Sequence, residues 1–353
     1  MTTTTVGDVT VRGISTGGPE HEYRQGEVRS VAASVYSDTT APAHLSVFEN
    51  AAIDRRRFAM PLEWYATPHG FGERNDAYRR VALQLAEEHA RRAIEAAGWS
   101  AEDVDAVVFV SSTGVSTPSL DADLVGRLGL RTSVARLPLF GLGCAGGAAG
   151  LARAADLVRA GYEHVLLVAV ELCSTTFVLD DDSAANFIGT ALFADGCAAV
   201  TVGPAAGRGP ELAHVLHAHS LTVPDTSWLT GWDVQDEGFR LRLAKEIPEA
   251  MAAALRPAVD DALETAGWKL DDLDAVALHP GGAKVITGYQ AVLGLSDDLL
   301  DPVRTVLREH GNMSSPTVLF VLDELLRRKT TGNTLMSASG PGFALEHLLL
   351  WLP

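Results

Sequence analysis

Ala93-Ile94-Glu95-Ala96-Ala97-Gly98-Trp99, followed by Asp103-Val104-Asp105-Ala106-Val107, recurs later in the chain as Ala262-Leu263-Glu264-Thr265-Ala266-Gly267-Trp268 and Asp272-Leu273-Asp274-Ala275-Val276. The two copies are offset by 169 residues without a gap. In each copy helix-forming residues end at a glycine and an apolar run follows, which is typical of a helix leading into a buried strand. The repeat predicts two copies of one αβ unit, related by a pseudo-twofold axis, within the 353 residues.

Alternating strands and helices on both sides of the repeat favour an α/β fold with a mixed, largely parallel sheet. We expect strands over residues 9–14, 105–110, 164–170, 193–202, 213–219, 274–279 and 333–339. We expect helices over residues 73–97, 121–128, 148–160, 245–266, 284–293, 302–309 and 315–329. The predicted halves are residues 1–205, which carry Cys144, and residues 206–353, which carry His279 and Asn312.

A glycine-dense turn from Leu142 to Gly150 places Cys144 at the start of a predicted helix. A helix start has unpaired N–H groups and a partial positive charge, which favour a thiolate over a thiol. The alternative is a buried structural cysteine.

The repeat relates this cysteine to two residues of the second half. An offset of 168 pairs Cys144 with Asn312, and the offset of 169 pairs Val110 with His279, at the end of a predicted strand. The twofold axis brings equivalent helix starts to the middle of the molecule, and α/β proteins place their sites at strand ends. We therefore expect Cys144, His279 and Asn312 to meet. Taken singly, His279 could be a solvated histidine and Asn312 a plain helix cap.

These three residue types suit carbon–carbon bond formation on thioesters. A cysteine beside a histidine can form a thiolate–imidazolium pair and act as a nucleophile. An asparagine amide offers an N–H group to a developing oxyanion. If Asn312 and protonated His279 both bind one thioester oxygen, the site would decarboxylate a malonyl thioester and direct its carbanion at an acyl group on Cys144.

Composition excludes several other classes of function. A net formal charge of −17 argues against binding to nucleic acid or to an anionic membrane. The longest apolar runs, such as Val165 to Val170, are too short to span a bilayer. Three cysteines without a CxxC motif or a His/Cys cluster indicate reduced thiols and no metal site. We expect a cytoplasmic protein.

Four segments of the sequence resemble, in order and spacing, the signature segments of the type III polyketide synthases: Gly143-Cys144-Ala145-Gly146-Gly147, His279-Pro280-Gly281-Gly282, Gly311-Asn312-Met313-Ser314-Ser315 and Gly340-Pro341-Gly342-Phe343. These are the chalcone synthase-like enzymes of the thiolase fold. The resemblance implies five-layered αβαβα protomers in a homodimer and a triad of Cys144, His279 and Asn312. It also implies iterative decarboxylative condensation of malonyl-CoA onto an acyl-CoA starter held on Cys144, with no cofactor besides these thioesters.

The resemblance also implies a set of substrate-binding positions: Phe193, Thr176, Trp232, Leu241, Ser314, Gly340, Pro341 and Gly342. Phe193 matches a phenylalanine between the CoA tunnel and the cavity, and Leu241 replaces a second one. Trp232 stands where bulk would limit the growing chain, although Phe193 and Trp232 could each be ordinary core aromatics. Thr176 and Ser314 match cavity hydroxyls, and the Gly-Pro-Gly loop resembles one that shapes ring closure; plain loop and turn roles are the alternatives.

Details of Glu171 to Ser174, Gly231 to Val234 and Gly340 to Phe343 are most similar to the alkylpyrone and alkylresorcinol synthases, which implies a fatty acyl starter and a pyrone or resorcinol product. The family's basic CoA-binding residues are not obvious, because no Lys or Arg lies between Arg29 and Arg55. Phosphate contacts are therefore expected from Arg55, Arg56 or Lys284. Two alternatives stay open: a one-step condensing enzyme similar to 3-ketoacyl-(acyl carrier protein) synthase III, and a non-catalytic acyl-CoA-binding subunit.

Overall fold

In the computed structural model, which describes residues 8–35, 41–179, 181 and 183–353, both copies of the sequence repeat fold alike. In the first, α4 (Phe71–Ala96) leads through a turn into β4 (Ala106–Val110); in the second, α8 (Ile247–Glu264) leads into β11 (Ala275–Leu278). Gly98 and Gly267, at the helix ends, both have φ of 69°. Glycine adopts this left-handed conformation without steric cost, so the repeat is a repeat of backbone geometry as well as of residues.

The strands of the two halves have the same connectivity. In the N-terminal half β4 is parallel to β6 (Val165–Leu172), β6 is antiparallel to β7 (Asp195–Pro204), and β7 is antiparallel to β1 (Val9–Gly17). In the C-terminal half β11, β12 (Gly332–Gly340), β13 (Ala344–Leu352) and β8 (Ala213–Thr222) are joined in the same parallel, antiparallel, antiparallel order. The expected duplication is thus present in the sheet topology.

A short seam joins the two sheets and fixes their relative position. Residues Val9 to Val11 of β1 pair with Ala213 to Val215 of β8, and the sheets diverge from that point. At the far edge of the N-terminal sheet lies β5 (Ala135–Leu139), parallel to β4. Among the described residues, no strand extends the C-terminal sheet beyond β11.

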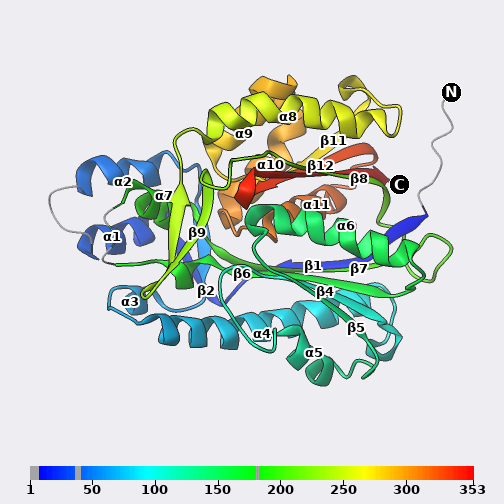
Figure 1. The fold of residues 1–353 in the computed structure, drawn as a ribbon, viewed down its shortest axis with the longest axis horizontal. Helices are drawn as coiled ribbons and strands as arrows, with labels where there is room; N and C mark the ends of the chain where they lie inside the picture. Colours follow the sequence, from blue (N-terminus) through cyan, green and yellow to red (C-terminus); the bar gives the residue numbers. More distant parts are fainter. Residues whose placement is uncertain (1–7, 36–40, 180, 182) are drawn as a thin grey trace.

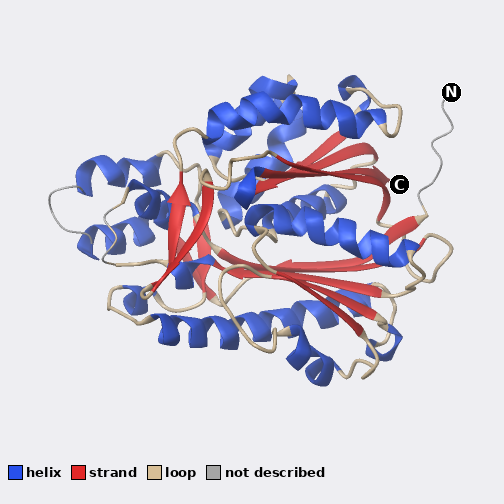
Figure 2. Ribbon diagram, viewed as in Figure 1, coloured by secondary structure: helices blue, strands red, loops and turns tan. Residues whose placement is uncertain are grey.

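Helices and sheets stack in five layers within the described part of the chain (Figures 1 and 2). Helices α4 and α5 (Asp121–Leu128) cover the outer face of the N-terminal sheet, and α8 and α9 (Ala283–Leu293) cover that of the C-terminal sheet. Between the sheets lie α6 (Gly146–Arg159) and α11 (Thr317–Arg327), with α10 (Asp297–His310) packed against α11 and β11. This is the expected αβαβα fold of thiolase type.

The remaining elements gather at one end of the layers, on the left in Figure 1. They are α1 (Gln25–Val35), α2 (Ala41–Glu49), α3 (Leu62–Tyr65), α7 (Ala184–Leu192), the pair β2 (His21–Arg24) and β3 (Arg55–Phe58), and the hairpin β9 (Thr230–Gln235) and β10 (Gly238–Leu243). Among them, α7 packs against β10 of the hairpin.

Several element boundaries differ from those expected. α10 begins at Asp297 and not at Pro302, because Ser296 caps it: the N–H of Leu299 donates to its hydroxyl at 3.4 Å. β7 begins at Asp195, since Phe193 forms an isolated bridge with Asn312 instead. β13 and the β9–β10 hairpin were not anticipated; β13 is buried on both faces, so its sequence shows no alternation of apolar and polar residues from which to recognise it.

Candidate active site

The two central helices touch at their starts, which explains the glycines around Cys144. A Cβ atom on Gly147 would lie 2.1 Å from the carbonyl oxygen of Ser315, and one on Gly146 would lie 2.6 Å from Cγ1 of Val110. Only glycine permits so close an approach. Cys144 lies in a 3₁₀ turn directly before α6, whereas Asn312 precedes α11 in an irregular segment rather than at the helix start itself.

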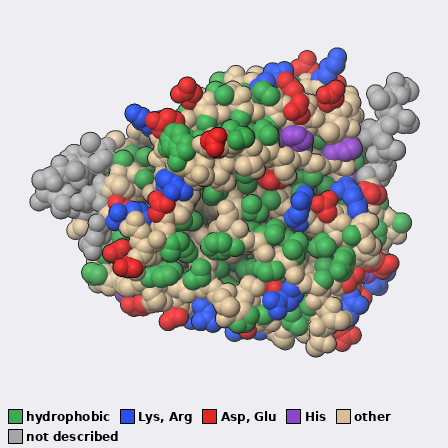
Figure 3. Space-filling view, in the orientation of Figure 1, with side chains coloured by type: hydrophobic (Ala, Val, Ile, Leu, Met, Phe, Trp, Pro, Cys, Tyr) green, Lys and Arg blue, Asp and Glu red, His purple; other side chains and the backbone are tan. Residues whose placement is uncertain are grey.

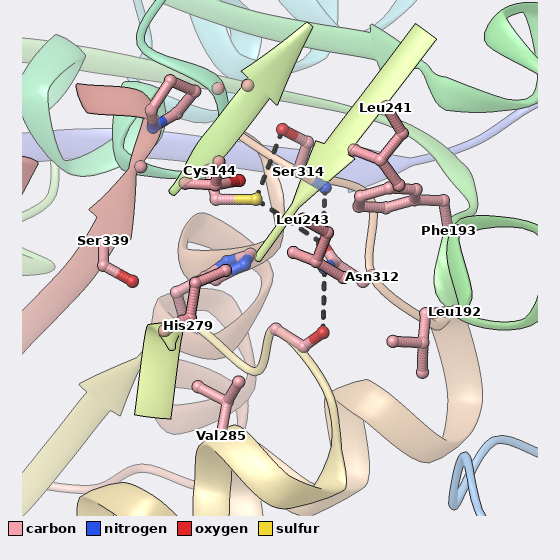
Figure 4. A pocket seen from close by; sticks show the side chains of 18 of the residues that line it. Cys144, Leu192, Phe193, Leu241, Leu243, His279, Val285, Asn312, Ser314 and Ser339 are labelled. Carbon is pink, nitrogen blue, oxygen red and sulfur yellow. Dashed lines mark hydrogen bonds between the residues drawn. The ribbon is translucent and has the colours of Figure 1, made fainter. Parts of the chain in front are cut away.

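Cys144, His279 and Asn312 do meet, and all of them line one cavity. The Cys144 sulfur lies 3.6 Å from Oγ of Ser314 and 4.0 Å from Oδ1 of Asn312. Figure 4 shows the imidazole of His279 beside this thiol, with Asn312 across from it. His279 directly follows β11, so one half supplies the sulfur and the other supplies the imidazole and the amide.

Asn312 is held rigidly. Its Oδ1 accepts a hydrogen bond from the Ser314 N–H at 2.8 Å, and its Nδ2 donates to the Gly281 carbonyl at 3.1 Å (Figure 4). A carboxamide nitrogen carries two hydrogens, so a second N–H remains beyond the one given to Gly281. Since Asn312 lines the cavity, that N–H can bind the oxygen of a thioester there.

Burial keeps the thiol and the imidazole uncharged. It raises the pKa of Cys144 to about 11 and lowers the pKa of His279 to about 3. Neither ring nitrogen of His279 has a hydrogen-bond partner among the described residues. Both shifts disfavour the expected thiolate–imidazolium pair in the unliganded site, because burial penalises each charge separately. A neutral imidazole is the form that can accept the thiol proton when a substrate arrives.

The cavity encloses about 130 Å³ and its lining is mostly apolar. Of the predicted substrate-binding positions, it is lined by Phe193, Trp232, Leu241, Ser314, Gly340 and Pro341. Apolar residues that the sequence did not single out complete it: Ile188, Leu192, Leu243, Ile247, Val285 and Phe343. Most of these lie on α7, on the β9–β10 hairpin or at the start of α9, where nothing in their local pattern separates a cavity wall from ordinary core.

The wall opposite Cys144 is built where the hairpin meets α7. Trp232 and Leu241 are directly opposite on β9 and β10, and the Trp232 ring lies 6.1 Å from that of Phe193. A Cβ atom on Gly189 would come within 2.8 Å of the Leu241 side chain. Gly189 thus lets the hairpin close against α7, and Leu241 occupies the place at which the family resemblance implies a second phenylalanine.

Two predicted positions lie outside the residues that line this cavity. Thr176 is not among the lining residues, and its hydroxyl donates to the Cys173 carbonyl at 2.7 Å. Gly342 also stays outside the lining; its φ of 73° forms the turn that brings Phe343 into the wall instead. Gly340 has a clear requirement for glycine, because a Cβ there would lie 2.3 Å from the Leu142 carbonyl oxygen, beside the Cys144 turn.

The basic residues expected to bind CoA phosphates differ in what they can reach. Arg56 is fully buried and its guanidinium bonds to Gln25 and to the carbonyls of Thr190 and Phe193, so its assignment to CoA is wrong. Arg55 is exposed but paired with Glu309 and Glu22. Lys284 is exposed at the start of α9, next to Val285 of the cavity lining, and is the residue of the three that a phosphate could reach near the cavity.

Glu171 was missed by the sequence reasoning. It is fully buried at the end of β6 and accepts hydrogen bonds at 2.8 Å from the Ser112 N–H and from the hydroxyls of Thr113 and Ser315. Because Ser315 belongs to the second half, Glu171 ties the halves together beneath Cys144. Burial raises its pKa to about 7. The available signal was a carboxylate directly after a wholly apolar strand, a position where a charge needs partners.

The described residues contain no group of three or more His, Cys, Asp or Glu side chains placed to hold a metal ion. A search of their helices for one long and apolar enough to cross a membrane finds none.

Comparisons with known proteins place this site in a family. Residues 64–206 match the model of the N-terminal domain of chalcone and stilbene synthases, and residues 214–352 match that of the C-terminal domain. A putative chalcone synthase of Bacillus subtilis is 40% identical over 86% of this chain and 87% of its own. The 1,3,6,8-tetrahydroxynaphthalene synthase of Streptomyces peucetius is 39% identical over 96% and 92%, respectively.

A solved structure agrees with the fold over nearly the whole length. The crystal structure of the 1,3,6,8-tetrahydroxynaphthalene synthase of Streptomyces coelicolor, a bacterial type III polyketide synthase, superposes with a TM-score of 0.91 at 30% identity, covering 97% of this chain and 99% of that one. With both domain models matched, the one-step condensing enzyme and the inert subunit lose their support. The chain belongs to the chalcone and stilbene synthase family, and it is a type III polyketide synthase, an acyltransferase that condenses malonyl-CoA units with decarboxylation.

Proposed function

We propose that Cys144 carries the growing acyl chain, that His279 moves the proton and that Asn312 holds the enolate oxygen. The observation that carries this assignment is the convergence of the three side chains, from both halves, on one mostly apolar cavity. Each side chain has a neutral form that suits its role, namely a thiol to be activated, an imidazole able to accept a proton and an amide N–H able to donate.

In the loading step, neutral His279 takes the proton of Cys144 as the sulfur attacks the thioester carbonyl of an acyl-CoA. The tetrahedral intermediate expels CoA as a thiolate, which takes the proton back from His279 and leaves as a thiol. The acyl group then remains on Cys144 as a thioester, and His279 is again neutral.

In the extension step, the carboxylate of malonyl-CoA leaves as CO2 and its electron pair forms an enolate. The N–H groups of Asn312 and His279 bind the enolate oxygen, and one such donor is typically worth about 3 kcal/mol of transition-state stabilisation. The carbanion attacks the acyl carbonyl on Cys144, and the tetrahedral intermediate expels the sulfur as a thiolate, which takes up one proton from water to restore the thiol. The product is a β-ketoacyl-CoA longer by two carbons, which can reload Cys144 for another round.

We propose an aliphatic, fatty acyl starter and ring closure to a pyrone or a resorcinol. Support comes from the apolar side chains around the cavity and from the segments that resemble alkylpyrone and alkylresorcinol synthases. Phe193, Trp232 and Leu241 would bound the chain on one side, and Gly340 and Pro341 on the other. The Ser314 hydroxyl, 3.6 Å from the sulfur, would lie beside the attached acyl group.

A second candidate is synthesis from malonyl-CoA alone, ending in a naphthalene. The relative named 1,3,6,8-tetrahydroxynaphthalene synthase is 39% identical over nearly the whole chain. The cavity volume of about 130 Å³ also lies below the roughly 300 Å³ at which ligand pockets usually begin, which favours a compact product.

A starter screen separates the candidates. The protein is incubated with malonyl-CoA alone and with each acyl-CoA from acetyl-CoA to palmitoyl-CoA, and the products are identified by mass. We expect products whose mass increases with the starter, together with release of CO2. A single product made without any starter would favour the naphthalene candidate, and absence of CO2 release under all conditions would refute both.

We further propose a homodimer in the cytoplasm, with CoA phosphates bound by Lys284. For the homodimer, Phe140 and Val115 are 61% and 42% exposed, and hydrophobic side chains spread over the lower half of the face in Figure 3, the side of the N-terminal sheet. Such exposed apolar area favours a protein–protein contact.

The cytoplasm is proposed because Cys144, Cys173 and Cys197 are all free thiols, and cysteines stay reduced in that compartment.

A further inference from the structure

The carbonyl groups at the carboxyl end of α7 are all bonded to groups outside the helix. Nη1 of Arg56 donates to the carbonyls of Thr190 and Phe193, at 2.8 and 2.6 Å. Nε2 of Gln25 donates to Ala191 at 2.8 Å, and the Asn312 N–H donates to Leu192 at 2.9 Å. Helix ends leave these carbonyls unpaired and carry a partial negative charge, so a guanidinium there is stabilising.

The same helix end is joined directly to the proposed active site. Phe193 and Asn312 form a parallel bridge, in which the Ala194 N–H donates to the Asn312 carbonyl at 2.8 Å. The backbone that carries the Phe193 wall and the backbone that carries the Asn312 amide are therefore one unit, and its position depends on where α7 ends.

Arg56 contacts this unit from both sides. Besides bonding to the carbonyls of Thr190 in α7 and of Phe193 directly after it, Arg56 places its aliphatic stem so close to Gly311 that a Cβ there would be 2.9 Å from Cγ and Cδ. Gly311 has φ of 71°, so this residue both turns the chain into Asn312 and admits the arginine. The guanidinium is fixed in turn by Oε1 of Gln25, 2.9 Å from Nε, and is fully buried.

We propose that Arg56 is a positioning residue for decarboxylative condensation: it locks the end of α7 and Gly311 together and so fixes Phe193 and Asn312 relative to each other. It does not line the cavity and acts only through these two residues. The proposal rests on the role proposed above for Asn312. Lysine could not replace it, because a single ammonium lacks the planar fork that reaches Gln25 and two carbonyls at once.

The test compares Arg56→Lys with Arg12→Lys. Arg12 is a matched control, since it too is fully buried with its guanidinium on backbone carbonyls, those of Pro204, Ala205, Gly209 and Pro210, and it lies outside the cavity. Thermal unfolding and steady-state decarboxylation of malonyl-CoA are measured for both. A loss of stability is expected in both variants. In Arg56→Lys alone, kcat should fall about 10- to 100-fold while KM changes little, as for a catalytic group displaced by up to about 1 Å.

Gln25→Ala keeps the test decisive if Arg56→Lys does not fold. It removes the bond to Ala191 and the partner of Nε but leaves the buried guanidinium in place, so kcat should fall in the same direction by a smaller factor. Wild-type kcat in the folded variants, or a raised KM with unchanged kcat, would overturn the proposal. A wild-type protein that fails to decarboxylate malonyl-CoA would instead refute the proposed function, which keeps the two failures distinct.

Discussion

The sulfur of Cys144 lies 4.0 Å from Oδ1 of Asn312, although 168 residues of chain separate them. The offset between them is within one residue of that of the repeat, so duplication of one αβ unit gave each half an equivalent position at the centre of the molecule. In the assignment proposed above, one copy holds the nucleophile and the other holds the oxyanion donor. The two roles therefore belong to different halves, and substitutions should separate them.

Cys144→Ala and Asn312→Ala should differ in the decarboxylation of malonyl-CoA, which the first variant should keep and the second should lose. Cys144→Ala removes the acyl carrier but keeps both donors, so it should still release CO2 while forming no condensed product. Asn312→Ala should lose decarboxylation by about 100- to 1,000-fold, the usual effect of deleting one oxyanion donor. CO2 and acetyl-CoA are measured together, with Asn333→Ala as control, because Asn333 is a half-buried asparagine of β12 that lies outside the cavity lining. Decarboxylation at the wild-type rate in Asn312→Ala would disprove its role.

Alkylation should distinguish Cys144 from the other thiols. Cys173 and Cys197 are fully buried, whereas Cys144 lines the cavity and is partly accessible. Iodoacetamide at neutral pH should therefore modify Cys144 first, as read by peptide mass spectrometry. Burial lowers the pKa of His279, so its imidazole is neutral and able to take the thiol proton. His279→Ala should slow the modification of Cys144, and an unchanged rate would show that the imidazole does not activate the sulfur.

The meeting of Cys144, His279 and Asn312 could be predicted from the sequence, because a repeated unit implies two halves related by a pseudo-twofold axis. A helix-to-strand unit that occurs twice with the same turn glycines, Gly98 and Gly267, imposes equivalent positions on whatever follows it. The local sequence then had to show only that His279 ends a predicted strand and that Cys144 and Asn312 precede predicted helices. The five layers were expected from the family resemblance, and the repeat by itself predicted only two copies of one αβ unit.

Residues whose role depends on long-range packing could not be predicted in this way. Arg56 belongs to a run of three arginines that is typical of surface charge, yet its partners Gln25, Thr190 and Phe193 come from distant segments. For Thr176 the family resemblance implied a hydroxyl facing the cavity, whereas in the structure this hydroxyl donates to the Cys173 carbonyl, three residues before it. The state of charge at Cys144 and His279 also depends on enclosure, which no motif indicates.

Glu171→Gln should change how stability depends on pH. Burial raises the pKa of Glu171 from 4.5 to about 7, so the folded protein holds a proton there that the unfolded chain has lost. The stability due to this proton is complete below about pH 4.5 and is lost as pH rises through about 7. Glutamine is neutral throughout and can keep the bonds, with Oε1 facing the Ser112 N–H and its amide facing the Ser315 hydroxyl.

The melting temperatures of Glu171→Gln and wild type are therefore compared from below pH 4.5 to above pH 7. The unfolding free energy of Glu171→Gln relative to that of wild type should increase as pH rises, by on the order of 3 kcal/mol across the range. The melting temperature of the variant should rise relative to wild type accordingly. Burial also raises the pKa of Asp195 to about 7, and the change of stability with pH that this carboxyl causes should be the same in both proteins. A difference that stays constant with pH would show that the pKa of Glu171 is the same in the folded and unfolded states, so that burial does not raise it.

Trp232→Ala should enlarge the cavity and lengthen the chains that it accepts. The indole packs between Phe193 and Phe239, with ring centroids 6.1 and 6.3 Å away, and it bounds the space next to the acyl site. Its removal should shift product masses toward longer starters or more extensions. Trp228→Ala is the control, because Trp228 is 52% exposed and outside the cavity lining. Identical product profiles for the two variants would show that Trp232 does not limit the chain.

Gly147→Ala should disturb the contact between the halves. The added Cβ would lie 2.1 Å from the Ser315 carbonyl oxygen, so α6 and the segment leading into α11 must separate. Overpacking of this kind typically costs about 1–3 kcal/mol of stability. The displacement should reach Asn312 and Ser314, three residues or fewer from Ser315, and reduce decarboxylation as well.

Gly126→Ala supplies the matched comparison. Gly126 lies inside α5, and a Cβ there would meet nothing within 4 Å. Alanine is favoured over glycine in a helix interior by roughly 0.5–1 kcal/mol, so this variant should melt higher than wild type and decarboxylate malonyl-CoA at the wild-type rate. If Gly147→Ala instead melts and reacts as Gly126→Ala does, the central helices can move apart freely, and the close contact at their starts does not hold the site in place.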